Sequence, residues 1–219
     1  MPTITVENYL KQVYLLQRGR ELAPMGKLAE AVGVTPGTAT TMVKTLADAG
    51  LADYEPRAGV RLTNAGMKLA LQVLRRHRLV ELFLVETLGL DWSEVHDEAE
   101  ELEHAISDKV LERIDILLGR PDTDPHGDPI PPSTGKPRKQ KLTALGACAP
   151  DMSVQIARVA DQRSDFLQFA ERHGLTPGAH VTIESHTPSA DAITVRPQNR
   201  EAVTLGSAAA MKIMVRVEG

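Results

Sequence analysis

Residues 35–50, TPGTATTMVKTLADAG, carry helix boundary signals at both ends. Thr35 is a residue type that caps helix N-termini, and Pro36 suits the first helical position, where its missing N–H is not needed. Gly50 suits the residue that closes a helix, because glycine adopts a positive φ without strain. The segment is therefore predicted to form one short helix with fixed ends.

The residues before this helix predict two further helices, and the residues after it predict a pair of strands. Apolar residues over 5–19 have helical spacing, and a short helix is expected over roughly 24–32. On the other side, residues 51–63 are typical of two short strands joined by the turn at 56–59. This order predicts a winged helix-turn-helix over residues 1–63.

The charge of this region favours a polyanionic partner. Residues 1–80 hold 11 Lys and Arg against 6 Asp and Glu, whereas residues 81–128 hold 3 against 15. Short hydroxyl side chains let a helix lie deep in the major groove, where they reach base edges and phosphates. The alternative is an ordinary helical core whose threonines face water. The predicted DNA-binding residues are Thr35, Pro36, Gly37, Thr38, Thr40, Thr41, Lys44, Arg57 and Arg61.

Residues 64–118 are predicted to form a helical domain. A long helix begins near Asn64, and its apolar residues fall on more than one face, which in a small domain suggests a subunit interface and hence a homodimer. A second, acidic helix is expected over residues 95–118, with apolar residues at helical spacing on its inward side.

Histidines and carboxylates on these two helices form a candidate metal site. At about 100° per residue, His96, Glu100, Glu103 and His104 share one face of the acidic helix. On the preceding helix, a histidine and a glutamate four residues apart (His77 and Glu81) form a matching pair. Nitrogen and oxygen ligands without thiolate favour Mn²⁺ or Fe²⁺. The alternative is a solvated acidic face with incidental histidines.

An enzyme is the weaker interpretation of the same residues. The Glu-x-x-His unit of di-iron bundles occurs at 101–104, but no second copy lies on a partner helix. The metalloprotease motif His-Glu-x-x-His is absent. We therefore expect no enzymatic activity.

The rest of the chain predicts a linker and a small β domain. Residues 119–141 are rich in proline and polar residues, as linkers are, and residues 142–219 contain short alternating runs and a helix near 162–173, typical of a small β-barrel. The chain is thus expected to be mainly α with a β component. With one cysteine, no secretion signal and no long apolar run, a cytoplasmic protein without a membrane partner is expected.

Two strings carry a resemblance to a known family. RRHRLVELFLVETLGLDWSEVHDEAEELEHAISD (residues 75–108) and DPHGDPIP (residues 124–131) resemble the metal-dependent repressors of the diphtheria toxin repressor and manganese transport regulator (DtxR/MntR) family. The resemblance covers nearly the whole chain. It implies a winged helix-turn-helix at 1–63, a helical dimerisation and metal-binding domain at 64–118, a proline-rich linker at 119–141 and an SH3-like (FeoA-like) domain at 142–219.

The resemblance also implies about two metal sites per subunit, each matched residue by residue. The primary, activating site would hold Asn8, Glu100, Glu103 and His104. The ancillary site would hold His77, Glu81 and His96, with Asp165 and Gln168 as further ligands from the C-terminal domain. A glutamate at position 100, where iron-sensing members have cysteine, points to Mn²⁺, with Fe²⁺ as the alternative.

Two positions depart from the family pattern. Asn8 stands where the family usually has Met or Asp, and Lys11 stands where one manganese-sensing branch has a carboxylate. The implied function is a homodimeric repressor of metal-uptake genes that binds a palindromic operator in double-stranded DNA. The rival interpretation is a metal-independent winged-helix regulator that responds to a ligand or protein at its C-terminal domain.

Overall fold

The computed structural model describes residues 3–133 and 140–217. Contacts divide the chain into two compact units. Of the described residues, the first unit holds 3–77, 103–105 and 131–133, and the second holds 78–102, 106–130 and 140–217. Residues 134–139 of the predicted linker lie outside the described residues.

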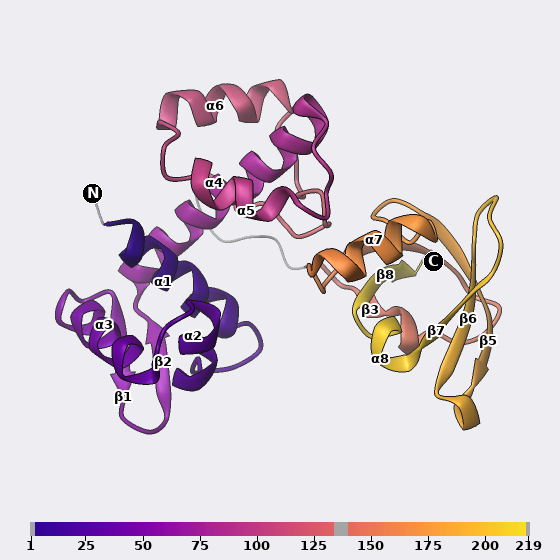
Figure 1. The fold of residues 1–219 in the computed structure, drawn as a ribbon, viewed down its shortest axis with the longest axis horizontal. Helices are drawn as coiled ribbons and strands as arrows, with labels where there is room; N and C mark the ends of the chain where they lie inside the picture. Colours follow the sequence, from indigo (N-terminus) through magenta and orange to yellow (C-terminus); the bar gives the residue numbers. More distant parts are fainter. Residues whose placement is uncertain (1–2, 134–139, 218–219) are drawn as a thin grey trace. The chain divides into compact units, whose positions relative to one another are not determined.

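The first unit has the predicted winged helix-turn-helix arrangement (Figure 1). Thr35 caps its third helix by accepting a hydrogen bond from the backbone N–H of Thr38. The hairpin turns through Arg57 and pairs its strands in antiparallel register, with Tyr54 opposite Val60. Its core is apolar and draws on every element of the unit. The elements are α1 (Ile4–Leu16), α2 (Met25–Ala31), α3 (Pro36–Asp48), β1 (Ala52–Glu55), β2 (Gly59–Leu62) and the first part of α4 (Asn64–Leu88).

The two apolar sides of α4 are covered within the chain. In the second unit, Leu79 and Leu82 pack with Ile114 of α6 (Asp108–Leu117). Another side of α4 packs against α5 (Val95–Leu102) through a cluster of Val80, Leu84, Val95 and Ala99. The large exposed apolar side chains in this part of the chain are Leu88, at the end of α4, and Leu102, Val110, Ile116 and Leu117.

The single helix predicted over residues 95–118 is wrong. The structure breaks it into α5 and α6, with residues 103–105 in a turn. The physical reason is a second N-cap: the Ser107 side chain accepts a hydrogen bond from the backbone N–H of Val110, which starts a new helix. Glu103 and His104 therefore do not continue the helix face that carries His96 and Glu100.

Part of the predicted linker is packed. Residues 122–130 form a tight loop in which Thr123 and Pro129 make an isolated β-bridge. Asp124, His126 and Ile130 in this loop are buried. The backbone N–H of Val159 donates to the carbonyl of His126, which ties the loop to a strand of the C-terminal sheet.

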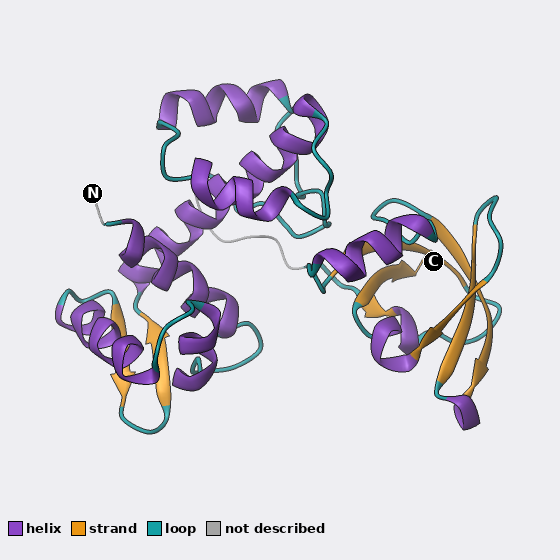
Figure 2. Cartoon of the chain, viewed as in Figure 1, coloured by secondary structure: helices purple, strands orange, loops and turns teal. Residues whose placement is uncertain are grey.

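The C-terminal part is the predicted small antiparallel β domain, and it carries the expected helix as well as a second, shorter one (Figure 2). Its six strands run in the order β3-β8-β4-β5-β6-β7 and enclose an apolar cluster that includes Trp92. The elements are β3 (Thr143–Ala144), η1 (Leu145–Ala147), β4 (Ser153–Val159), α7 (Ser164–Arg172), β5 (His180–Thr187), η2 (Pro188–Ala190), β6 (Ala192–Pro197), β7 (Val203–Gly206), α8 (Ser207–Ala210) and β8 (Ile213–Val217). Across the described ranges, none of the helices combines the length and apolar character that a membrane span requires.

Candidate metal sites and nucleic-acid interface

The threonines of α3 are largely engaged within their own helix. Thr40 and Thr41 donate to the carbonyls of Pro36 and Gly37 at 2.8 and 3.1 Å. The hydroxyls of Thr35 and Thr38 lie 2.9 Å apart at the N-terminus of the helix. Each hydroxyl oxygen still has lone pairs for an incoming donor. Lys44 of α3 is exposed, so its charge is available at the helix surface.

The two predicted hairpin arginines differ in what surrounds them. Arg57 is exposed at the tip, where its φ of 69° shapes the turn. Arg61 contacts the carboxylates of Asp53, Glu55 and Glu21 at 3.1, 3.2 and 3.6 Å. The hydrogen bond to Asp53 is the main cause of the raised pKa of Arg61. The charge of Arg61 is therefore partly neutralised by these carboxylates. Of the two arginines, Arg57 is the better placed to bind a phosphate of the DNA backbone.

Glu103 is the centre of the polar cluster in the first unit. Its carboxylate is fully buried, and Oε1 accepts from Lys11 Nζ at 2.8 Å. Oε2 lies 2.7 Å from His77 Nδ1. Burial by itself raises the pKa of Glu103, but the hydrogen bond and charge of His77 and the ion pair with Lys11 outweigh it and lower that pKa. The carboxylate is thus held ionised in a buried place.

His104 contacts two residues of α1 and also the carboxylate of Glu103. Its Nε2 lies 3.0 Å from Asn8 Oδ1 and 3.3 Å from Glu103 Oε1. Its Nδ1 lies 2.8 Å from Glu7 Oε2. A hydrogen on Nδ1 that donates to Glu7 leaves the Nε2 lone pair facing two oxygen acceptors. Two oxygens and one imidazole nitrogen that converge without a hydrogen between them fit a divalent cation.

The primary-site residues expected from the sequence are divided between the units. Asn8, Glu103 and His104 lie in the first unit, whereas Glu100 lies on α5 in the second. Glu7 was missed, although it stands next to Asn8 in the first turn of the first helix. Its contact with His104 is the kind that fixes the tautomer and orientation of a metal-binding histidine.

A second buried cluster lies in the second unit, around Glu81. Glu81, Asp124 and His126 each offer one ligand atom, and these atoms lie within 4.8 Å of one another. The three side chains are almost fully buried. His126 Nε2 donates to the carbonyl of Trp92 at 2.8 Å, so Nδ1 is the acceptor nitrogen whenever the ring is neutral. Within the described part of the chain, this Nδ1 has no hydrogen-bond partner.

The charges around Asp124 also fit a cation. Burial, and next the negative charge of Glu81, raise the pKa of Asp124 well above its ordinary value, against the opposing charge of Arg78. Arg78 Nε lies 3.2 Å from Asp124, and its Nη2 lies 3.1 Å from Asp128. Arg78 is shared between Asp124 and Asp128, and Arg158 also contacts Asp128 at 3.4 Å, so a divalent ion among Glu81, Asp124 and His126 would relieve the remaining repulsion.

His96, expected in the ancillary site, lies beside Glu81. Its Nδ1 is 3.1 Å from Glu81 Oε1, and its Nε2 is 3.7 Å from Glu100 Oε1. The side chain of His96 is 46% exposed. Of the other expected ancillary ligands, Glu81 shares the second unit with His96, whereas His77 belongs to the first unit, where it contacts Glu103.

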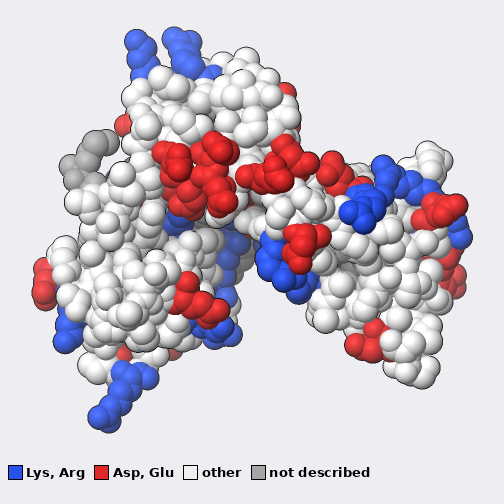
Figure 3. All heavy atoms as spheres, in the orientation of Figure 1, with Lys and Arg blue, Asp and Glu red and all other residues white. Residues whose placement is uncertain are grey.

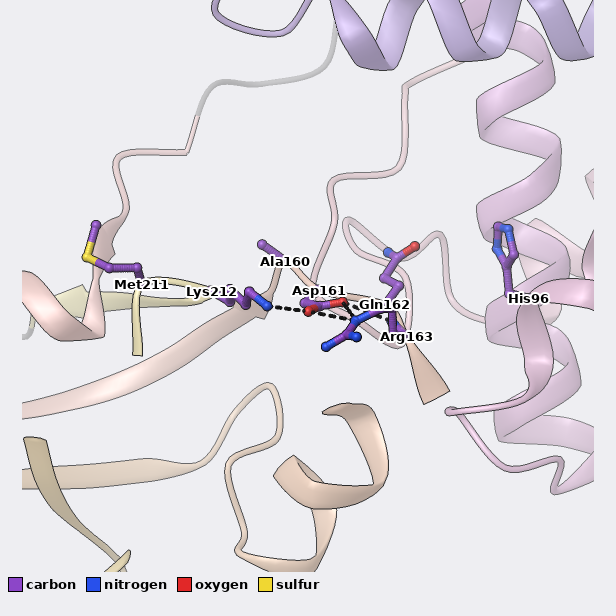
Figure 4. Close-up of a pocket in the computed structure, with 7 residues that line it drawn as sticks. All are labelled: His96, Ala160, Asp161, Gln162, Arg163, Met211 and Lys212. Carbon is purple, nitrogen blue, oxygen red and sulfur yellow. Dashed lines mark hydrogen bonds and ion pairs between the residues drawn. The ribbon is translucent and has the colours of Figure 1, made fainter. Parts of the chain in front are cut away.

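A cavity of about 540 Å³ has His96 on one side and residues of the C-terminal domain on the other (Figure 4). Asp161 lines it and is held by Lys212 at 2.7 Å and by Arg163 at 3.3 Å. The expected C-terminal ligands lie further along, on α7, where Asp165 is 72% exposed and Gln168 bonds to Ser164. Neither Asp165 nor Gln168 is among the residues that line this cavity.

The surface charge agrees with the division found in the sequence. Figure 3 shows acidic side chains gathered on the helical part of the chain around α5. Asp97, Glu98 and Glu101 of α5 are exposed. Such a surface attracts cations and repels nucleic acid, so the DNA-binding surface must be sought on the basic first unit.

Comparison with known families gives three matches along the chain. Residues 1–60 match the model described as iron dependent repressor, N-terminal DNA binding domain. Residues 63–132 match iron dependent repressor, metal binding and dimerisation domain. Residues 143–217 match the FeoA domain.

Individual relatives agree with these matches. The iron-dependent repressor IdeR of Mycobacterium tuberculosis is 32% identical over 213 residues, which is 92% of this chain and 92% of that protein. The HTH-type transcriptional regulator MntR of Lysinibacillus sphaericus is 33% identical over 126 residues, covering 56% of this chain and 90% of that protein. Among solved structures, a manganese-dependent transcriptional repressor in complex with manganese matches with a TM-score of 0.89 and 38% identity, over 97% of this chain and 100% of that one.

Proposed function

The chain belongs to the DtxR/MntR family of metal-dependent repressors, and we propose that Mn²⁺ activates it to repress metal-uptake genes, with Fe²⁺ as the alternative metal. The observation that supports this most is the convergence of Asn8 Oδ1, Glu103 Oε1 and His104 Nε2. All three atoms are nitrogen or oxygen, and hard oxygen ligands suit Mn²⁺. No thiolate is in this set to favour a softer ion.

The proposed mechanism links α1 to the turn at residues 103–105. Asn8 and Glu7 lie on α1, whereas Glu103 and His104 lie in the turn, so their contacts join the DNA-binding module to the segment that follows α5. In this proposal Glu100 completes the primary set from α5. A bound divalent cation would supply the positive charge that holds these carboxylates together. Without the cation, the ion pair of Lys11 with Glu103 and the contact of His104 with Glu7 still join α1 to the turn, but they hold it less firmly.

DNA binding in this proposal uses a homodimer in the cytoplasm. The helical part carries exposed apolar side chains that a second copy can cover, and they are Leu88, Leu102, Val110, Ile116 and Leu117. A two-fold dimer presents two α3 helices to successive major-groove turns, so a palindromic operator in double-stranded DNA is expected. Lys44 and Arg57 supply phosphate contacts, and the threonines of α3 lie at the groove.

The first prediction concerns metal removal. Operator affinity, measured by fluorescence anisotropy at fixed salt, is expected to rise by about 100-fold or more between excess EDTA and saturating Mn²⁺. Parallel titrations with Fe²⁺ and Zn²⁺ rank the metals. If operator affinity in EDTA equals that in Mn²⁺, the metal-independent regulator is the correct interpretation instead.

The second prediction concerns the second metal ion. We propose that Glu81 holds it with Asp124 and His126, while His96 stands next to it. Asp124→Asn and His126→Gln are then expected to reduce the Mn²⁺ stoichiometry from about two ions per subunit to about one, because each removes a ligand. Isothermal titration calorimetry measures this, with the exposed Asp122→Asn as the matched control. If His96→Gln lowers the stoichiometry and His126→Gln does not, the ancillary set of His77, Glu81 and His96 is favoured.

A further inference from the structure

Lys11 is a buried cation inside the candidate primary site. It lies one turn after Asn8 on α1, and its side chain is only 2% exposed. A buried lysine is uncommon, because removing an ammonium from water is unfavourable unless a partner compensates. Its partner is Glu103 Oε1, at 2.8 Å.

The oxygen that accepts from Lys11 is also the oxygen nearest to His104. Glu103 Oε1 lies 3.3 Å from His104 Nε2, and that nitrogen lies 3.0 Å from Asn8 Oδ1. A divalent cation held by Glu103 Oε1 and His104 Nε2 would share this oxygen with the ammonium. Two positive charges on one buried carboxylate repel each other strongly, because water screens them little.

We propose that the ammonium of Lys11 is a built-in competitor of the metal ion for Glu103 Oε1. This competition raises the concentration of divalent cation that the primary site requires for binding. In the metal-free protein, the ammonium keeps Glu103 in place and balances its charge. When the cation arrives, it must either displace the ammonium or bind beside it. This inference rests on the metal-dependent function proposed above.

The test replaces the charge while keeping a side chain of similar length. Lys11→Gln and Lys11→Met are each expected to bind Mn²⁺ at the primary site about tenfold more tightly, which corresponds to about 1.4 kcal/mol. Competition of the full chain with a fluorescent chelator for Mn²⁺ measures this affinity. Both metal-free variants are expected to melt at a lower temperature than the wild type, since they lose the ion pair with Glu103.

Two controls keep the result specific to the charge of Lys11. Lys27→Gln removes an exposed ion pair with Glu30 in the same module and is expected to leave the Mn²⁺ affinity unchanged. Lys11→Arg keeps the positive charge and is expected to stay close to the wild-type affinity. If Lys11→Gln and Lys11→Met do not fold, as judged by circular dichroism, tenfold tighter binding by Lys11→Arg overturns the proposal and wild-type affinity supports it.

The outcomes separate this inference from the proposed function. If the wild type binds Mn²⁺ and Glu103→Gln does not, the primary site stands. Unchanged or weaker binding by the Lys11 variants then overturns the competitor role alone. If the wild type binds no Mn²⁺, the proposed function and this inference fail together.

Discussion

Glu103→Gln is expected to abolish metal-dependent operator binding and to weaken Mn²⁺ binding at the primary site by about 100-fold or more. Glu103 is the one carboxylate in the described structure that contacts Lys11, His77 and His104 together. Gln has nearly the same shape, but its amide offers one neutral oxygen and no charge for a cation. Anisotropy of labelled operator DNA and chelator competition measure the two effects.

The matched control for this substitution is Glu101→Gln. Glu101 lies on α5, two residues before Glu103, but it is exposed, so its replacement is expected to change metal and DNA affinity by less than about twofold. Thermal denaturation without metal is needed as well, because Glu103→Gln leaves the buried ammonium of Lys11 without its counter-charge. If folded Glu103→Gln still binds the operator only in Mn²⁺ and with wild-type affinity, the assigned primary site is wrong.

Gly127→Ala is expected to give the second large effect, a loss of about 3–5 kcal/mol in unfolding free energy of the second unit. Gly127 has a φ of 85°, and an added Cβ would lie 2.0 Å from the carbonyl oxygen of Ala157 and 2.8 Å from Arg158 Cα. These are backbone atoms of β4, so the loop at residues 122–130 must move away from the sheet. Asp124 and His126 are on that loop, so the second metal ion is expected to be lost too.

Gly178→Ala is the control that separates the steric clash expected in Gly127→Ala from the backbone strain of a positive φ. Gly178 has nearly the same φ, 89°, but a Cβ there would meet no atom within 4 Å. It is expected to lose only about 1–2 kcal/mol, the effect of the left-handed conformation itself. Denaturant unfolding followed by the fluorescence of Trp92 reports on this region, because this single tryptophan stacks on His126 at 5.5 Å. Equal losses in the two variants would show that the loop is not tightly packed on β4.

Local signals account for the parts of the fold that were predicted well. Thr35, Pro36 and Gly50 bound α3 through cap and φ preferences that act within a few residues of the chain. The strands of the C-terminal domain follow their alternating apolar residues in the same way. Ser107 carried the same kind of signal, but the continuous helical spacing around it favoured a single helix.

The candidate metal sites were only partly predictable. Residue types and their spacing identified Glu103, His104 and Asn8, but a continuous helix was assumed where the structure has a turn. Asp124 and His126 belong to the string DPHGDPIP, but the prolines of this segment predicted a linker and not a metal site. Their burial against α4 depends on contacts with residues more than 40 positions away, such as Glu81.

The sequence by itself determined the winged module, the order of the domains, the ligand types and the separation of charge, since these follow from local preferences and composition. The tertiary structure decided which charges meet. Lys11 and Glu103 are 92 residues apart in sequence and 2.8 Å apart in space. No periodicity or cap preference encodes such a contact, because it arises only when distant segments pack and remove both groups from water.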